Sequence, residues 1–318
     1  MFARFLTSAI RLSATFLYGS TGEIIVEKSG HLNLGIPGVM CVGSAVGCLT
    51  QYFLCRAGLN TTLIVVIIPL LTTFLAGGLM GLLYSFLTVT LRANQNVVGL
   101  AMTTLGTGLC GYMLSPLGAR LHIIASASRA YANMFGVTGN NWFVQIFLSH
   151  GWLFYLAVII AIGAQIILNR TRLGLNLRAV GENPATADAV GINVTAFRYS
   201  ATVIGCGISA VGGLYVIMDY MGGMWDKVDF VEGLGWLALA LVIFTLWRPA
   251  LSIIGSVLFA ALYIASSYIT GITFAQIELI KSLPYIVTIL VLIITSILGG
   301  KKVQPPTALG LNYFREER

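Results

Sequence analysis

Long apolar stretches, separated by short polar loops, constrain the fold of this chain more than any other feature of its sequence. A membrane-spanning helix needs about 20 mostly apolar residues, and most of the stretches reach that length. The 61–91 stretch is too long for one untilted crossing, and Pro69 with Gly77 and Gly78 predicts a kink or tilt within it. The 233–247 stretch is short enough to be a half-helix or an incomplete crossing. The nine stretches lie at about residues 5–21, 34–54, 61–91, 95–114, 151–168, 199–218, 233–247, 250–270 and 282–299.

The composition supports a membrane protein and excludes an ordinary soluble domain. Only 9% of the 318 residues are charged and 57% are hydrophobic, with a mean hydropathy of +0.90. A soluble domain is about a quarter charged, so this chain has too few charges to cover a water-facing surface. We therefore expect an all-α polytopic integral membrane protein, a single domain over residues 1–318 with about 8–10 transmembrane helices. No basic patch with interleaved aromatic residues indicates a nucleic-acid partner.

Loop charges predict which side of the membrane each loop faces. Residues 169–198 contain four arginines against two acidic residues, and the C-terminal tail is also basic, so both should be cytoplasmic. Residues 219–232 contain four acidic residues against Lys227 alone, so this loop, which begins at Asp219, should lie outside. If all nine stretches cross, the N-terminus is outside; if one is re-entrant, it is inside. The 5–21 stretch is expected to be a retained first membrane segment lying partly in the interface.

Two loops are candidates for contacts with other proteins. The 115–150 segment is a long outside loop, too polar to span the membrane and apolar enough to pack, and it is either a docking site for another protein or a structured plug or cap with no partner. Within the cytoplasmic loop, residues after Pro184 predict a short helix, with Asn183 as the N-cap and Gly191 as the stop. Such a helix is either a docking surface for a soluble partner or a connector that anchors two spans.

The groups that catalysis or ion coupling would need are missing from the apolar stretches. From Leu34 onward their cores contain no Asp, Glu, Lys or Arg, whereas ion- or proton-coupled carriers usually keep an intramembrane carboxylate. The chain has no phosphate-binding G-x-x-x-x-G-K-[ST] loop, so active transport would need ATP hydrolysis on another chain. The five cysteines form no C-x-x-C pair and the three histidines are scattered, so neither a disulfide framework nor a metal site is expected.

Three motifs, in order along most of the chain, carry a family resemblance. RAVGENPATADAVGIN resembles the cytoplasmic coupling segment of ABC-importer permeases of the ribose and branched-chain amino acid type. GEIIVEKSGHLNLGIPGVM (22–40) and GLGWLALALVIFTLWRP (233–249) are similar to further segments of those permeases. Thr186 and Val190 depart from the coupling pattern, which has alanine there, and Pro37 stands where the nucleoside subgroup often has glutamate. The coupling pattern is matched at Ala179, Val180, Gly181, Asn183, Pro184, Ala187, Gly191 and Ile192.

The resemblance implies a permease subunit of an ATP-driven importer in the cell's cytoplasmic (inner) membrane. Its implied partners are ABC ATPase subunits, a second permease subunit (identical or paralogous), membrane lipid, and an extracytoplasmic solute-binding lipoprotein, which could dock on the 115–150 loop. The chain would bind no cofactor, because ATP is used by the partner ATPase. The first motif points to nucleosides as cargo, with ribose-like sugars or branched-chain amino acids as alternatives; a facilitative channel without an ATPase is the rival. The implied ATPase-coupling residues are Gly181, Glu182, Asn183, Pro184, Ala187, Gly191 and Ile192.

A substrate pathway is expected where two Gly-interrupted segments, 94–111 and 232–241, hold similar places in the two halves of the chain. Their similarity indicates an internal pseudo-repeat, and neutral polar groups beside an aromatic ring suit an uncharged polar cargo. Alternatively, the threonines bond to carbonyls of their own helix. The candidate pathway residues are Asn96, Thr103, Thr104, Thr107 and Trp236.

The N-terminal motif also contains two carboxylates, and their spacing indicates what they contact. Glu23 and Glu27 lie one helical turn apart beside Lys28, so local pairing at the cytoplasmic face is expected rather than contact with cargo.

Overall fold

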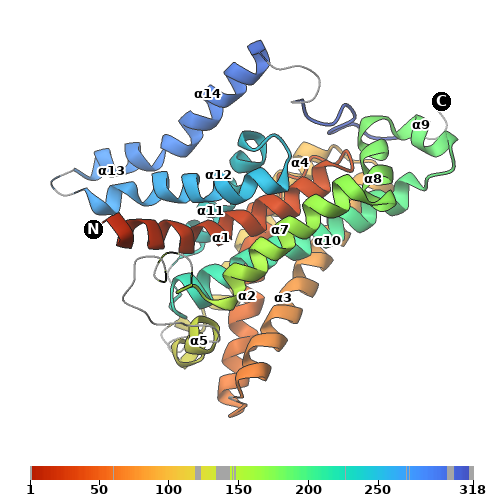
Figure 1. Cartoon of the computed structure of the whole chain (residues 1–318). Helices are drawn as coiled ribbons and strands as arrows, with labels where there is room; N and C mark the ends of the chain where they lie inside the picture. The colour runs from red at the N-terminus through yellow and green to blue at the C-terminus, as the bar shows by residue number, and fades with distance from the viewer. Residues whose placement is uncertain are drawn as a thin grey trace.

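The computed structural model describes residues 2–59, 61–118, 123–133, 144, 146, 148–225, 227–269, 271, 273–298 and 304–314, and this part of the chain contains helices and no strands (Figure 1). Each of the nine apolar stretches corresponds to a helix. The elements are α1 (Phe2–Glu27), α2 (Ile36–Arg56), α3 (Thr62–Ser85) with η1 (Phe86–Thr90), α4 (Gln95–Leu114), α5 (Ile124–Asn133), α7 (Trp152–Arg170), α8 (Arg172–Glu182), α9 (Pro184–Ala189), α10 (Val194–Tyr215) with η3 (Val216–Tyr220), α11 (Val228–Phe244), α12 (Pro249–Ile264) with η4 (Ala265–Tyr268), α13 (Phe274–Lys281) and α14 (Leu283–Leu298).

Seven helical segments of the described chain are long and apolar enough to cross a membrane, which confirms an all-α, multi-pass membrane protein. Large apolar side chains are exposed along these segments, as expected where lipid replaces water. The segments lie at Ile36–Arg56, Thr62–Thr90, Gln95–Leu114, Trp152–Arg170, Val194–Tyr220, Pro249–Tyr268 and Ala275–Ile297.

The other two helices from apolar stretches, α1 and α11, are less apolar or shorter and lie inside the bundle. α1 has 26 residues and packs against α7, α10, α11 and α12. Its polar side chains, such as Ser13, Thr15 and Ser20, are buried among these helices rather than facing lipid. The polar residues that lower the hydropathy of the 5–21 stretch thus face other helices, and its position relative to the membrane interface stays a prediction. α11 has 17 residues, a length of about 25 Å.

Small residues allow α10 to pack closely against the helices around it. A Cβ placed on Gly213 of α10 would lie 2.0 Å from the backbone oxygen of Met40 in α2. A Cβ on Gly43 of α2 would lie 2.2 Å from the backbone oxygen of Ala210. In lipid, such close backbone contact stabilises helix pairs because the hydrophobic effect contributes little there.

Replacing Gly213 with alanine should therefore destabilise the fold. The added methyl group forces α2 and α10 apart, and overpacking of this kind costs about 1–3 kcal/mol. We expect a lower midpoint of thermal unfolding for the detergent-purified protein. Gly108→Ala is the matched control, since a Cβ at Gly108 meets no atom within 4 Å. Equal unfolding temperatures for both variants would contradict the packing argument.

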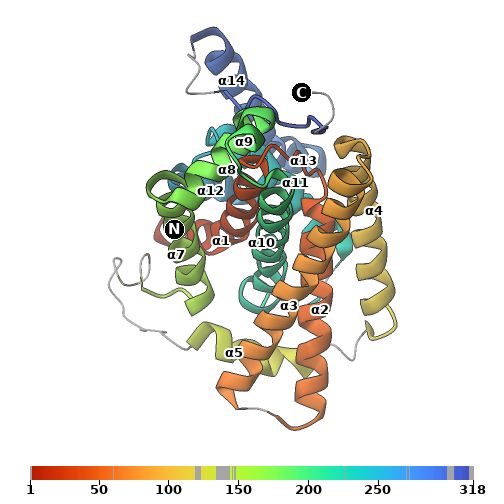
Figure 2. The same cartoon turned by 90° about the vertical axis from the view of Figure 1, so that its right-hand side faces the viewer.

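The bundle has two ends that the following sections distinguish. The α9 end carries α8, α9 and the C-terminal segment (residues 304–314), and the α5 end carries α5 beside the far ends of α2 and α3 (Figures 1 and 2). α5 is the described helix of the 115–150 loop, and the Tyr131 hydroxyl of α5 donates to the backbone oxygen of Val65 at 2.9 Å. Residues 119–122 and 134–143 of that loop lie outside the described chain.

The α3–η1–α4 and α10–η3–α11 segments share one unusual turn. In each, an α-helix ends in five π-helical residues and a positive-φ residue follows: Arg92 (φ 56°) after η1 and Gly222 (φ 66°) after η3. The closing hydrogen bonds have the same spacing: Ala93 N donates to Leu87 O, and Gly223 N donates to Ile217 O. η1 lies at the α9 end and η3 at the α5 end, so the two segments run in opposite directions. This geometry agrees with the pseudo-repeat expected from the sequence.

Two charged residues that the apolar stretch 199–218 left out belong to the α10–η3 helix and are buried. Asp219, expected on an outside loop, lies within η3 and is 1% exposed. The Arg11 guanidinium of α1 pairs with it: Nε lies 3.2 Å from Asp219 Oδ1, and Nη2 donates to the Asp219 backbone oxygen. At the other end of the helix, Arg198 is 2% exposed. The loop assignment of Asp219 is wrong because hydropathy places a charge outside the helix, whereas an ion pair keeps this one inside.

Candidate functional site at the α9 end

The expected short helix is present between Asn183 and Gly191. Asn183 Oδ1 accepts a hydrogen bond from Thr186 N at 3.0 Å, and Pro184 is the first residue of α9. Gly191 has φ 88°, a left-handed conformation that glycine adopts without steric cost. The N-cap, the first residue and the stop predicted for this helix are thus confirmed.

The seven predicted coupling residues divide into a buried and an accessible group. Gly181 and Ala187 are buried, and Ala187 packs with Val180 and Val194 in a small apolar cluster. These residues hold α8, α9 and the start of α10 together, so no partner can touch them directly. The accessible group comprises Glu182, Asn183 and Gly191, which are exposed, and Pro184 and Ile192, which are half-buried.

The coupling residues predicted from the family pattern do not include Val190, the most exposed large apolar side chain between Gly181 and Ile192. Val190, a departure from the family pattern, is 72% exposed and lies immediately before the Gly191 turn. Beside it, Ala185, Thr186 and Ala189 are also exposed. Together these four residues give α9 a small, weakly polar face directed away from the bundle.

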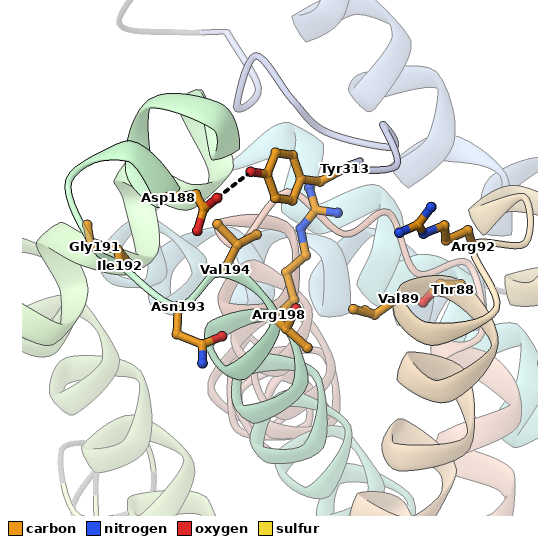
Figure 3. A pocket seen from close by; sticks show the side chains of 11 residues that line it. Thr88, Val89, Arg92, Asp188, Gly191, Ile192, Asn193, Val194, Arg198 and Tyr313 are labelled. Atoms are coloured by element: carbon orange, nitrogen blue, oxygen red, sulfur yellow. Dashed lines mark hydrogen bonds between the residues drawn. The ribbon is translucent and has the colours of Figure 1, made fainter. Parts of the chain in front are cut away.

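A pocket of about 340 Å³ separates α9 from the end of η1 (Figure 3). Asp188 lies on one side of it and Arg92 on the other, and Tyr313 of the C-terminal segment reaches between them. The Tyr313 hydroxyl donates to Asp188 Oδ2 at 2.8 Å. Figure 3 shows the Arg198 side chain rising from α10 toward the Tyr313 ring. Arg198 Nη2 donates to the backbone oxygen of Leu311 at 3.2 Å.

The N-terminal motif forms the buried floor beneath this region. Glu23 Oε1 accepts from Asn33 N at 3.2 Å, and a Glu27 carboxylate oxygen accepts from the Trp247 indole N–H. Both glutamates are buried, and neither forms an ion pair with Lys28 within the described chain. The loop before α2 and the turn after α11 supply neutral donors to these carboxylates, and Lys28 acts on Glu27 through its charge without a direct ion pair.

Burial also lowers the pKa of two groups in the loop between α1 and α2. Burial lowers the pKa of His31 well below its usual value, and the nearby Arg198 guanidinium lowers it further. His31 Nδ1 lies 3.0 Å from Thr202 Oγ1, whose hydroxyl donates to Arg198 O at 2.8 Å. His31 is thus a neutral ring that donates from Nδ1. Burial likewise lowers the pKa of Lys28.

The candidate pathway residues on α4 lie at different depths. Thr103 is nearly buried, and its hydroxyl donates to Leu34 O at 2.8 Å, across to the start of α2. Thr104 and Thr107 bond to carbonyls of their own helix, Leu100 O at 3.2 Å and Thr104 O at 3.0 Å. This is the alternative weighed from the sequence, and it holds for two of the three threonines.

The remaining pathway candidates are Asn96 on α4 and Trp236 on α11. Asn96 is exposed at the first turn of α4, and Trp236 of α11 is half-buried with its indole N–H 3.4 Å from Glu232 Oε1. α4 and α11 meet on either side of the first turn of α2: a Cβ on Gly38 would lie 2.6 Å from Thr103 Cα, and one on Gly235 would lie 2.5 Å from Pro37 Cα. The structure thus brings Thr103 and α11 to one place and leaves Asn96 and Thr104 on an open helix face.

The described residues contain no cluster suited to a metal ion. No group of three or more His, Cys, Asp or Glu side chains there is placed to hold a metal ion. The five cysteines are free, and four of them are buried. The arrangement at the α9 end offers a shaped surface and a pocket.

Comparison with known proteins identifies the family. Residues 5–296 match the family model described as "Branched-chain amino acid transport system / permease component". The chain belongs to this permease family. The permease is 31% identical over 317 residues to the nucleoside ABC transporter permease protein NupC of Lactococcus lactis subsp. cremoris, covering 96% of this chain and 95% of the relative. It is therefore a transport subunit of the ABC type and not an enzyme, and the family implies ATPase and binding-protein partners.

Other relatives extend the range of named cargoes. The permease is 27% identical to the guanosine ABC transporter permease protein NupQ of Bacillus subtilis, with 96% of this chain and 95% of the relative covered. It is 29% identical to the putative glucose ABC transporter permease protein TsgC13 of Haloferax volcanii, with 82% and 76% covered. No solved structure matches the chain.

Proposed function

We propose that the permease translocates nucleosides in an ATP-driven importer, receiving them from an extracytoplasmic binding protein. The observation that carries this proposal is the match over nearly the whole length of the chain to a relative named as a nucleoside permease. The relative named as a guanosine permease supports the same cargo. A sugar cargo is the second candidate, favoured by the relative named as a putative glucose permease.

The α9 end is proposed to face the cytoplasm and to bind the ATPase. Arginines gather at this end, among them Arg92, Arg172, Arg178 and Arg248, which fits the excess of basic residues in cytoplasmic loops. The C-terminal segment is bonded to α8, since Ala308 N donates to Gly181 O at 3.0 Å, so the C-terminus would be cytoplasmic too. The exposed face of α9 is the proposed contact with the ATPase.

The substrate pathway is proposed to run along α4 beside α11, lined by Asn96, Thr103, Thr104, Thr107 and Trp236. A threonine hydroxyl that donates to a carbonyl still has lone pairs that can accept a hydrogen bond from a nucleoside. The outer face of α4 is open, with Val97 and Tyr112 65% and 80% exposed. A second permease subunit, identical or paralogous, is proposed to close this face. ATP-driven movement of α9 would then reorient the helices that line the pathway.

Uptake of labelled guanosine by cells with and without the gene tests this function. We expect gene-dependent uptake that is competed by unlabelled nucleosides and not by glucose, ribose or leucine, and that stops when cellular ATP is depleted. Competition by glucose or ribose instead would move the cargo to sugars. Gene-dependent uptake that survives ATP depletion would favour a facilitative channel and contradict the importer.

A further inference from the structure

The C-terminal segment follows the last membrane helix and lies across the α9 end of the bundle. Its described residues form no helix, yet hydrogen bonds join them to α8 and α9 on one side and to the region of η1, α4 and α10 on the other. Gly310 N donates to Gly30 O at 3.1 Å, which ties the middle of the segment to the loop between α1 and α2. The bonds on the two sides fall into a near group, to α8 and α9, and a far group, to η1, α4 and α10.

The near group attaches the segment to the proposed ATPase-coupling region. Glu182 Oε2 accepts from Thr307 twice, from the backbone N–H at 3.3 Å and from the hydroxyl at 2.8 Å. The Tyr313 hydroxyl donates to Asp188 Oδ2 at 2.8 Å. Two acidic residues of the α8–α9 region thus both bind side chains of the C-terminal segment.

The far group attaches the segment to the turn where α3 ends and α4 begins. Asn312 Nδ2 donates to Arg92 O at 2.8 Å and to Ala93 O at 3.3 Å. Gln95 Nε2 of α4 donates to Asn312 Oδ1 at 3.2 Å and to Leu311 O at 3.3 Å. The Arg92 guanidinium lies over the Phe314 ring, 4.8 Å from its centroid. Cation–π contact of this kind adds to the hydrogen bonds.

The pocket makes this attachment mechanically important. It separates α9 from η1, with Asp188 and Arg92 on its opposite sides, and Tyr313 spans it (Figure 3). α9 itself packs on α8 and α10, and α10 also contacts η1. The C-terminal segment is therefore a second connection between α9 and η1, beside the one that runs through α10.

We propose that the C-terminal segment, residues 304–314, links α9 to η1 and α4, so that Thr307, Tyr313 and Asn312 are positioning residues for ATP-driven transport. This proposal rests on the proposed function, because it assumes that an ATPase moves α9. It assigns the segment a role in carrying that movement to the helix on which the pathway is proposed to lie.

Side-chain variants at the two ends test the link. Thr307→Val with Tyr313→Phe removes the hydroxyl bonds to Glu182 and Asp188, and Asn312→Ala removes the bonds to Arg92 and Ala93. In proteoliposomes with the complete transporter, each variant should lower guanosine imported per ATP hydrolysed by about threefold to tenfold, the factor expected for one or two net hydrogen bonds. ATP hydrolysis itself should continue. Tyr199→Phe is the control, because its hydroxyl joins α10 to Thr90 without touching the segment, and its coupling should stay within twofold of wild type.

Combining the near and far variants distinguishes a link from two independent contacts. If the segment is one link, breaking either end already removes this connection between α9 and η1. The triple variant should therefore import no less guanosine per ATP hydrolysed than the variant of either end alone, which is a non-additive result. Losses that multiply would overturn the proposal. Wild-type coupling in both end variants would overturn it as well.

Hydrogen exchange on binding of a non-hydrolysable ATP analogue separates this proposal from the proposed function and needs no cargo. We expect exchange to change in 183–192 and in 86–98 of the wild type, and only in 183–192 of the end variants. No change in 183–192 of the wild type would contradict the ATPase contact itself. Equal changes in 86–98 of wild type and variants would leave that contact standing and overturn the link.

Discussion

Replacing Val190 with glutamate should reduce ATP-dependent uptake at least tenfold while leaving the amount of inserted permease unchanged. Val190 is 72% exposed on the outer face of α9, where the ATPase is proposed to bind. A glutamate in a dry interface loses its hydration without gaining a partner, and such an unpaired charge costs several kcal/mol of binding. The measurement is nucleoside uptake normalised to permease in isolated membranes.

Ala57→Glu is the matched control for this experiment. Ala57 is exposed in the turn after α2, at the opposite end of the bundle from α9, and the substitution introduces the same charge. Uptake by that variant should stay near wild type. Full uptake by a well-inserted Val190→Glu permease would show that α9 does not bind the ATPase.

Ala187 and Gly191, the residues the family pattern favours for such a test, would give an ambiguous answer. Ala187 is 2% exposed and a larger side chain there would separate α9 from α10. Gly191 holds a left-handed conformation that costs other residues about 1–2 kcal/mol. Either substitution would lower uptake by unfolding the segment, whether or not an ATPase binds it.

Replacing Arg11 with methionine should destabilise the permease by about 3 kcal/mol, the largest stability loss we expect from a single polar substitution. Asp219 is 1% exposed, and within the described chain its carboxylate has Arg11 as its ion-pair partner. Removing one partner leaves a buried charge uncompensated, which costs about 3–5 kcal/mol. The Arg11 side chain is 39% exposed, so the lower value applies. Thermal unfolding of purified protein measures the change.

A second variant separates loss of the charge pair from loss of the Arg11 side chain. Arg11→Met combined with Asp219→Asn removes both charges, and replacement of whole buried pairs is often close to neutral. The double variant should therefore recover more than half of the lost stability. A double variant as unstable as Arg11→Met alone would show that packing of the arginine stem, rather than its charge, stabilises the helix pair.

The helices and the α9 turn could be predicted because their signals are local. Apolar length predicts a helix wherever it occurs, and the Asn183 cap and Gly191 stop act within a few residues of themselves. The sequence missed contacts between residues far apart in the chain. Arg11 and Asp219 are separated by 208 positions. A hydropathy scale takes no account of a distant partner, so it placed the Asp219 carboxylate in a loop.

The same limitation applies to α1 and to the C-terminal segment. The polar residues of α1 face other helices in the bundle centre, and no local pattern in the sequence indicates those neighbours. The C-terminal segment has neither apolar periodicity nor a helix signal, and its order depends on backbone groups of Gly30, Gly181 and Arg92. Every residue has a backbone carbonyl, so the residue types do not show which carbonyls will accept these hydrogen bonds.

The matched turns after η1 and η3 differ in what stabilises them. Arg92 holds a left-handed conformation at a cost of about 1–2 kcal/mol, and its contacts with Asn312 and Phe314 help to offset that cost. Gly222 holds the same conformation without a steric cost. The turn at the α9 end therefore depends on the C-terminal segment, whereas the backbone of the turn at the α5 end needs no such support.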